Sequence, residues 1–228
     1  MANSEHISKQ FDAELEAVRS RVLQMGGLVE SQIRQAVDSL VNGDVALMNR
    51  VIAMEVEIDE ICNHILVRRQ PAAGDLRMVM TVIKTITDLE RIGDEAEKIA
   101  RMAKLLSQKE RLYLPRYNEI KRASAIVLDM LHKSLDAFAR LDLATAATVV
   151  RQDELVDEEF RTIMRYLITF MMEDPRTIST ALEILFVAKA IERIGDHAKN
   201  MSEYVVYMVK GRDVRHVTVE EIEREVQR

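Results

Sequence analysis

The chain has 228 residues, so either one large domain or two small ones are expected. Hydrophobic residues make up 48% of it, while glycine (7) and proline (3) are scarce and tryptophan is absent, which favours long helices packed on one another. The formal net charge of −6 argues against nucleic acid as a main partner, because a phosphate backbone is bound by a basic surface. We therefore expect an all-α protein.

The cysteine content and the length of the apolar segments indicate the subcellular location of the protein. The single cysteine, Cys62, excludes an internal disulfide framework and fits a reducing compartment. The N-terminal segment lacks the basic and then apolar order of a signal peptide. The longest apolar stretches, such as residues 184–188, are far too short to cross a bilayer. These features predict a cytoplasmic protein.

In the first half, apolar residues recur at helical spacing. Long helices are predicted over residues 15–42, 44–69 and 76–106. Gly43 is the predicted C-cap of the first and Asp44 the N-cap of the second. Proline and glycine interrupt the chain over residues 70–75, where Asp75 is placed to cap the third helix.

The second half repeats this order after a connection over residues 107–118. Helices are predicted over residues 119–140, from the break at 141–142 to 172, and over 176–210. Pro175 ends the second of them and Gly211 follows the last. The tail over residues 214–228 is predicted to form a short helix that packs back onto the rest.

An internal repeat relates the two halves. The segment Glu-Arg-Ile-Gly-Asp at residues 90–94 occurs again, unchanged, at residues 192–196. One helix earlier, a Glu-x-x-x-Asp pair in the first half matches an Asp-x-x-x-Asp pair in the second. We therefore predict two tandem three-helix bundles, residues 1–110 and 111–228.

These repeated carboxylate pairs are candidate metal sites. Residues at i and i+4 share one helical face, so two such pairs on neighbouring antiparallel helices converge at their seam. Four gathered carboxylates repel one another unless they bind cations or protons, and oxygen ligands suit magnesium, calcium, manganese or iron, while zinc also fits. The predicted metal ligands are Glu55, Asp59, Glu90 and Asp94 in the first half and Asp153, Asp157, Glu192 and Asp196 in the second.

Two equivalent glycines adjoin these pairs. A glycine inside a helix costs about 1 kcal/mol relative to alanine, so Gly93 and Gly195 suggest close backbone approach or room for a ligand. The competing interpretation is a solvated charged face, in which Arg91 and Arg193 neutralise neighbouring carboxylates.

Other polar residues carry weaker signals. His197 follows Asp196, but the equivalent residue in the first half is Glu95. At most, therefore, His197 contacts the metal ligands without binding the metal itself. Cys62 and His64 have no histidine or cysteine counterparts in the second half, and we expect them to pack. Three arginines flank the loop around Pro71 and could form a basic patch for an anion or a partner: Arg68, Arg69 and Arg77.

These features together resemble the PhoU family of bacterial phosphate-transport regulators. The resemblance covers nearly the whole chain: the two three-helix halves, the carboxylate pairs, both Glu-Arg-Ile-Gly-Asp segments and the inter-helix segment at residues 69–77. It implies that the pairs bind metal, often as iron or zinc clusters, and that the protein is a homodimer. It also implies a negative regulator of phosphate uptake and phosphate-starvation signalling, which links the phosphate ABC transporter ATPase to a membrane sensor histidine kinase and reaches the membrane only through these partners.

Two other classes of function stay open on sequence alone. One is a carboxylate-metal-dependent enzyme, such as a hydrolase or oxidase with two metal sites. The other is a helical scaffold without metal. No nucleotide-binding glycine loop, catalytic-triad motif or Glu-x-x-His signature occurs, so we expect a protein that is not an enzyme.

Overall fold

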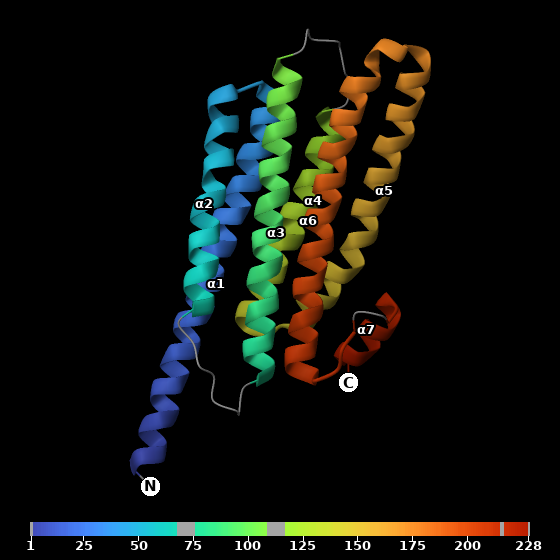
Figure 1. Ribbon diagram of the computed structural model, residues 1–228. Helices are drawn as coiled ribbons and strands as arrows, with labels where there is room; N and C mark the ends of the chain where they lie inside the picture. Colours follow the sequence, from blue (N-terminus) through green and yellow to red (C-terminus); the bar gives the residue numbers. More distant parts are fainter. Residues whose placement is uncertain (1, 68–75, 109–116, 215–216, 228) are drawn as a thin grey trace.

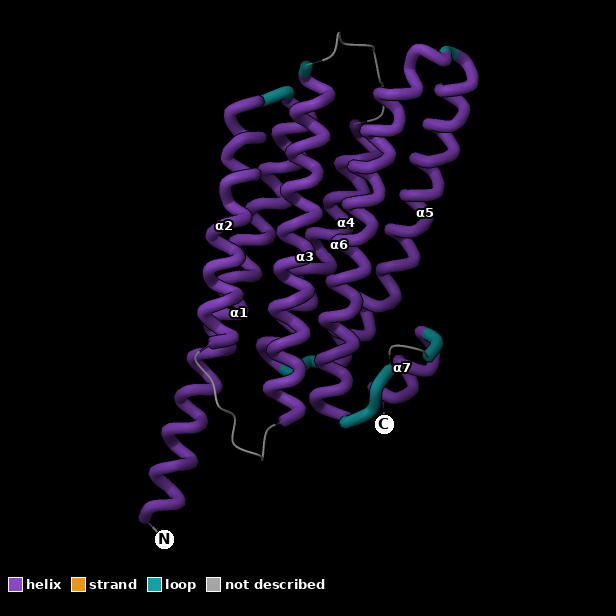
Figure 2. Tube along the Cα trace, viewed as in Figure 1, coloured by secondary structure: helices purple, strands orange, loops and turns teal. Residues whose placement is uncertain are grey.

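The computed structural model describes residues 2–67, 76–108, 117–214 and 217–227 (Figure 1). For some residues within these ranges the structure describes the backbone but not the side chain, among them Asp59, Cys62 and His64. The described elements are α1 (Ala2–Asn42), α2 (Val45–Val67), α3 (Leu76–Ser107), α4 (Tyr117–Arg140), α5 (Leu143–Glu173), the short 3₁₀ helix η2 (Pro175–Thr177), α6 (Ile178–Lys210) and α7 (Val219–Gln227). No strand occurs among these residues, which confirms the all-α prediction (Figure 2).

The long helices form two layers. The helices α2, α3, α6 and α5 lie side by side in one layer, while α1 and α4 lie behind them (Figure 1). Within each half the three helices contact one another, and between the halves α3 and α6 make the most extensive contact in the molecule. These two helices run in opposite directions (Figure 1). The predicted pair of three-helix bundles is therefore correct, and the bundles pack through their third helices.

The helix ends follow local backbone chemistry. Gly43 has a φ of 68° and the Asp44 side chain accepts a hydrogen bond from the Leu47 amide at 3.0 Å, which confirms both predicted caps. Asp142 caps α5 by accepting bonds from two backbone amides, at 2.9 Å and 3.2 Å. Gly211 ends α6 with a φ of 72°.

The apolar stripe of the first helix is buried as predicted. Five of its residues lie in one continuous core that also takes in residues of the other five long helices: Val18, Val22, Met25, Val29 and Ile33. The tail helix α7 packs on α5 and buries Ile222, which confirms the prediction that the tail packs back. Thr218 and Glu221 cap α7 reciprocally, each accepting a bond from the other's backbone amide at 3.3 Å and 3.2 Å.

Several sequence predictions fall outside the described residues. These are the Asp75 cap, the arginines at positions 68 and 69, the turn around Pro71, the boundary between residues 110 and 111, and the side-chain roles of Asp59, Cys62 and His64. Of the described helices, none has both the length and the apolar character required to cross a bilayer.

Candidate functional site

In the first half, three helices meet at Gly93. A Cβ atom added there would lie 3.3 Å from Glu55 Oε2 on α2 and 3.3 Å from Gln32 Oε1 on α1. The buried Gln32 amide donates to Glu55 Oε2 at 3.3 Å and to the Val51 carbonyl at 3.3 Å. The missing side chain at position 93 therefore lets the Glu55 carboxylate approach the α3 backbone, as the sequence suggested.

Two further first-half candidates lie on α3. Glu90 is half-buried and Asp94 is exposed, one turn apart on α3. Glu55 reaches Gly93, which stands between these two positions in the sequence, so Glu55 lies at the level of both carboxylates along α3. The structure thus brings Glu55 to the segment of α3 that carries Glu90 and Asp94, and joint metal binding by these carboxylates stays a prediction.

In the second half, α5 and α6 meet through Asp153. Its carboxylate is buried and accepts a hydrogen bond from Lys199 Nζ on α6 at 2.8 Å. Desolvation by burial, together with the charges of Glu192 and Asp153, raises the pKa of Asp196 to about 6 against the opposing charges of Lys189 and Lys199. Three of the four predicted ligands therefore share one electrostatic environment.

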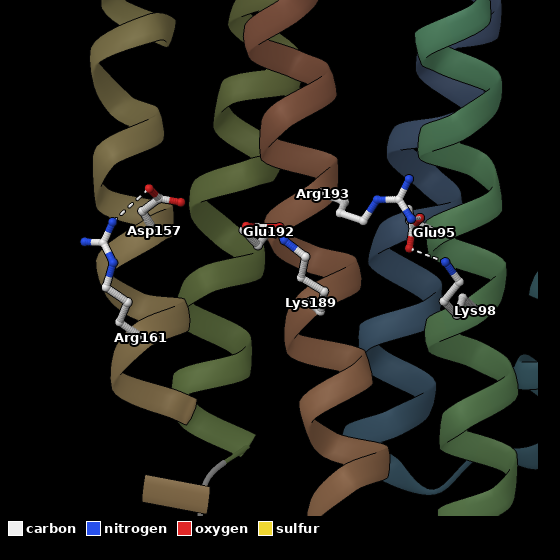
Figure 3. Close-up of polar contacts among 7 residues, drawn as sticks. All are labelled: Glu95, Lys98, Asp157, Arg161, Lys189, Glu192 and Arg193. Carbon is white, nitrogen blue, oxygen red and sulfur yellow. Dashed lines mark hydrogen bonds and ion pairs between the residues drawn. The ribbon is translucent and has the colours of Figure 1, made fainter. Parts of the chain in front are cut away.

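Basic side chains partner these carboxylates. Glu192 accepts from Lys189 Nζ at 2.6 Å, and Asp157 accepts from Arg161 on its own helix at 3.0 Å (Figure 3). Burial lowers the pKa of Lys199, but its hydrogen bond to Asp153 raises it and the net direction is upward. No three His, Cys, Asp or Glu side chains of the described chain are grouped closely enough to hold a metal ion. A cation would therefore have to displace these basic partners, and the metal sites stay a prediction.

The two equivalent glycines of the repeat, Gly93 and Gly195, differ in their surroundings. A Cβ atom at Gly195 would meet Val127 on α4 and Val156 on α5 at 3.4 Å, an ordinary van der Waals distance. Apolar side chains, and no carboxylate, are therefore nearest to this glycine. The sequence interpretation of close approach or ligand space holds at Gly93 and has no counterpart at Gly195.

The seam between α3 and α6 holds ion pairs that connect the halves. Glu95 Oε1 lies 2.8 Å from Arg193 Nη1, and Glu95 Oε2 lies 2.7 Å from Lys98 Nζ (Figure 3). His197 Nδ1 lies 2.7 Å from Asp88 Oδ1, and both side chains are buried. His197 therefore belongs to the contact between the halves, whereas the sequence placed it behind the metal ligands.

Sequence reasoning missed Asp88, Lys189 and Lys199, which shape the charge of these sites. One signal was available for Asp88 and His197. Both stand where the repeat is broken, since the equivalent residues are Ala190 and Glu95. Where two otherwise matching segments differ, the differing residues are candidates for a contact between the two halves. Asp88 and His197 make such a contact.

Comparisons with known proteins give consistent results. A family model described as the PhoU domain matches the chain twice, over residues 22–103 and 120–205. The phosphate-specific transport system accessory protein PhoU homolog of Pseudomonas aeruginosa is 48% identical over 230 residues, which cover 97% of this chain and 94% of that protein. The phosphate-specific transport system accessory protein PhoU of Escherichia coli (strain K12) is 46% identical over 228 residues, covering 97% of this chain and 94% of that protein.

Solved structures agree with these sequence matches. The crystal structure of PhoU from Pseudomonas aeruginosa superimposes with a TM-score of 0.80 at 47% identity, covering 89% of this chain and all of that one (100%). The phosphate transport system regulatory protein PhoU from Streptococcus pneumoniae also gives a TM-score of 0.80, at 26% identity, covering 90% of this chain and 99% of that one.

Proposed function

The chain belongs to the PhoU family, and on that basis we propose that it is a metal-binding adaptor that restrains phosphate uptake and phosphate-starvation signalling. Its relatives are named as accessory or regulatory proteins of phosphate transport, which favours a regulatory role without catalysis. The proposed partners are the ATPase of the phosphate ABC transporter and a sensor histidine kinase. They would hold the protein, as a homodimer, at the cytoplasmic side of the membrane.

The observation that carries the metal proposal is the crowding of negative charge around Asp196. Burial and the charges of Glu192 and Asp153 together raise its pKa to about 6, and a bound cation relieves the repulsion among the three carboxylates. All of the described candidate ligands offer oxygen atoms, which magnesium, calcium, manganese and iron accept and zinc tolerates. A metal competes with Lys189 and Lys199 for these oxygens, so binding depends on the total charge of the cation as well as on its geometry.

Metal binding is tested on protein purified without added metal or chelator. Elemental analysis and titration with Mn²⁺ are expected to show cations bound by the parent protein, with loss of the second-half site in Asp153→Asn and Asp196→Asn. Asp136→Asn is the matched control, because Asp136 is a half-buried carboxylate on α4 that belongs to none of the predicted ligand pairs and lies 3.9 Å from Arg140. Unaltered metal content in both site variants would reject the proposed ligands.

The regulatory role is tested by gene deletion. Phosphate-starvation genes are expected to become active in phosphate-rich medium and to be repressed again by a plasmid copy of the parent. If expression in high phosphate stays unchanged after deletion, the regulatory proposal is wrong. Pull-downs against the transporter ATPase and the kinase, with Mn²⁺ and with chelator, then show whether metal is required for either contact.

A further inference from the structure

A charged groove lies where α3 and α6 pack against each other, in the layer formed by α2, α3, α6 and α5. It is open to solvent, has a volume of about 570 Å³ and is lined by four basic side chains: Arg91, Lys98, Arg101 and Arg193. The first three come from α3, and Arg193 reaches across from α6 (Figure 3). The groove thus draws its cations from both halves and adjoins the first-half carboxylates through Asp94, which also lines it.

Two acidic residues of the groove fix these cations in place. Glu95, whose side chain is 4% exposed, contacts both Arg193 and Lys98, at 2.8 Å and 2.7 Å. Glu97 contacts Arg101 at 2.5 Å. The carboxylate of Glu95 is therefore below the surface, while the basic groups that it holds are about half exposed above it. Such positioning lowers the entropy lost when basic groups close on a ligand.

Arg91 is the cation that this network leaves over. In the repeat, Arg91 is equivalent to Arg193, which pairs with Glu95. The residue equivalent to Glu95 is His197. His197 turns inward to Asp88 and offers Arg91 no carboxylate. Within the described chain Arg91 is exposed and has no ion pair, so the break in the repeat adds an unneutralised guanidinium to the groove.

We propose that this groove binds a tetrahedral oxyanion, with inorganic phosphate as the ligand that fits its chemistry. Guanidinium groups match phosphate through parallel N–H···O bonds, and two of them face the groove from opposite sides of the seam. Arg193 uses Nη1 for Glu95 and keeps further donors for a ligand. Arg91 supplies a second guanidinium group. Lys98 and Arg101, each paired with a glutamate, offer further N–H donors at the end that lies toward the α3 C-terminus.

Asp94 sets a condition on binding. Its carboxylate lines the same groove and repels an anion unless a cation neutralises it. In this respect the inference rests on the proposed metal site, so anion affinity rises when that site is loaded. The arginine contacts do not depend on metal, and Asp94→Asn removes the repulsion without any cation.

Isothermal titration with sodium phosphate tests the proposal on four proteins in metal-free buffer: the parent, Asp94→Asn, Asp94→Asn/Arg91→Gln and Asp94→Asn/Arg34→Gln. Arg34 is the matched control, an exposed arginine on α1 that lies 3.8 Å from Glu30 and does not line the groove. We expect saturable binding that is tighter in Asp94→Asn than in the parent. Loss of Arg91 should weaken it about tenfold or more, and loss of Arg34 should leave it unchanged. Because Arg91 is exposed and has no ion pair within the described part of the chain, we expect Arg91→Gln to retain the fold.

The outcomes separate the anion site from the metal site. Binding by metal-free Asp94→Asn that depends on Arg91 supports the oxyanion site even if no metal ever binds. An equal heat response to sodium chloride at matched ionic strength would overturn the proposal, because it would report general screening. Absence of saturable binding in Asp94→Asn, or equal affinity with and without Arg91, would also overturn it.

Discussion

Gly93 and Gly195 occupy equivalent positions in the repeat, yet a methyl group at each would meet different neighbours. At Gly195 it finds ordinary contacts with two valines, so Gly195→Ala should stabilise the fold by up to about 1 kcal/mol through helix propensity. At Gly93 it lies 3.3 Å from the side chains of Gln32 and Glu55, which must shift, so Gly93→Ala should gain less or lose stability. Urea unfolding of both variants checks this order, and equal effects would contradict it.

The raised pKa of Asp196 makes stability depend on pH. An unfolded aspartate titrates near pH ~4, whereas this carboxyl has a pKa of about 6 in the folded protein. Between these values the folded state holds a proton that the unfolded state has lost, so the free energy of unfolding falls as the pH rises from about 4 to about 6.

Asp196→Asn should remove this dependence. In chelator-treated protein we expect the variant to be more stable than the parent by about 1 kcal/mol near pH ~7, since solvent screens part of the repulsion around an exposed group. The difference should vanish below pH ~3, where the carboxyl of the parent is protonated in both the folded and the unfolded state. Chemical unfolding at the two pH values measures it, and a variant less stable than the parent near pH ~7 would show that Asp196 is not repelled.

At the scale of residues, sequence predicted positions better than partners. The i, i+4 spacing places Glu90 beside Asp94 and Glu192 beside Asp196, because helix geometry is local. The partner of Asp153 is Lys199, 46 residues away on another helix, and only the packing of α5 on α6 brings the two together. Gln32, which contacts Glu55 from α1, was likewise out of reach of any local pattern.

At the scale of elements, the start of α5 depends on one side chain. Asp142 accepts bonds from the backbone amides of Ala144 and Thr145 and from the Thr145 hydroxyl at 2.7 Å. Asp142→Ala should therefore cost about 1 kcal/mol or more of stability. Asp44→Ala at the start of α2 is the natural comparison, because Asp44 accepts a single described amide bond, and it should cost less. Thermal unfolding of the two variants tests the ranking.

The ends of these helices were predictable to different degrees. Gly43 and Asp44 follow preferences that act over a few residues, and both were identified from sequence. Leu141, the residue before the Asp142 cap, has a φ of 55°, a conformation that leucine rarely adopts. Sequence marked a break there but gave no reason to expect a left-handed residue, since the cap and the packing of α4 and α5 impose it.

At the scale of the whole molecule, the buried pair of Asp88 and His197 connects the two halves. Asp88→Ala leaves the His197 ring without its carboxylate partner inside the seam and should cost about 1–3 kcal/mol. Because α3 and α6 form the largest contact between helices, we expect both halves to unfold together in one weakened transition. Unfolding followed by circular dichroism checks this against Asp136→Ala, which should be near neutral. Two separate transitions would show that the halves fold independently.

The order of helices and the duplication were legible in the sequence, because both repeat a local pattern. The way in which the bundles associate was not. Nothing in the spacing of the repeat indicated that α3 would pack against α6 in the opposite direction, or that Glu95 would pair with Arg193. The direction of packing and the pairs across the seam depend on how well the whole surfaces of α3 and α6 complement each other. Each single residue contributes little to that complementarity.

The opposed packing of α3 and α6 has made the two halves complementary and no longer interchangeable. If a second copy of the first half replaced the second half, Glu95 would stand where His197 now meets Asp88, and two buried carboxylates would oppose each other at each edge of the seam. If the second half were doubled instead, His197 would stand where Glu95 now meets Arg193, and imidazole would face guanidinium. The two halves therefore fit each other through residues that differ between them, and a chain built from two identical halves would lose these matched contacts.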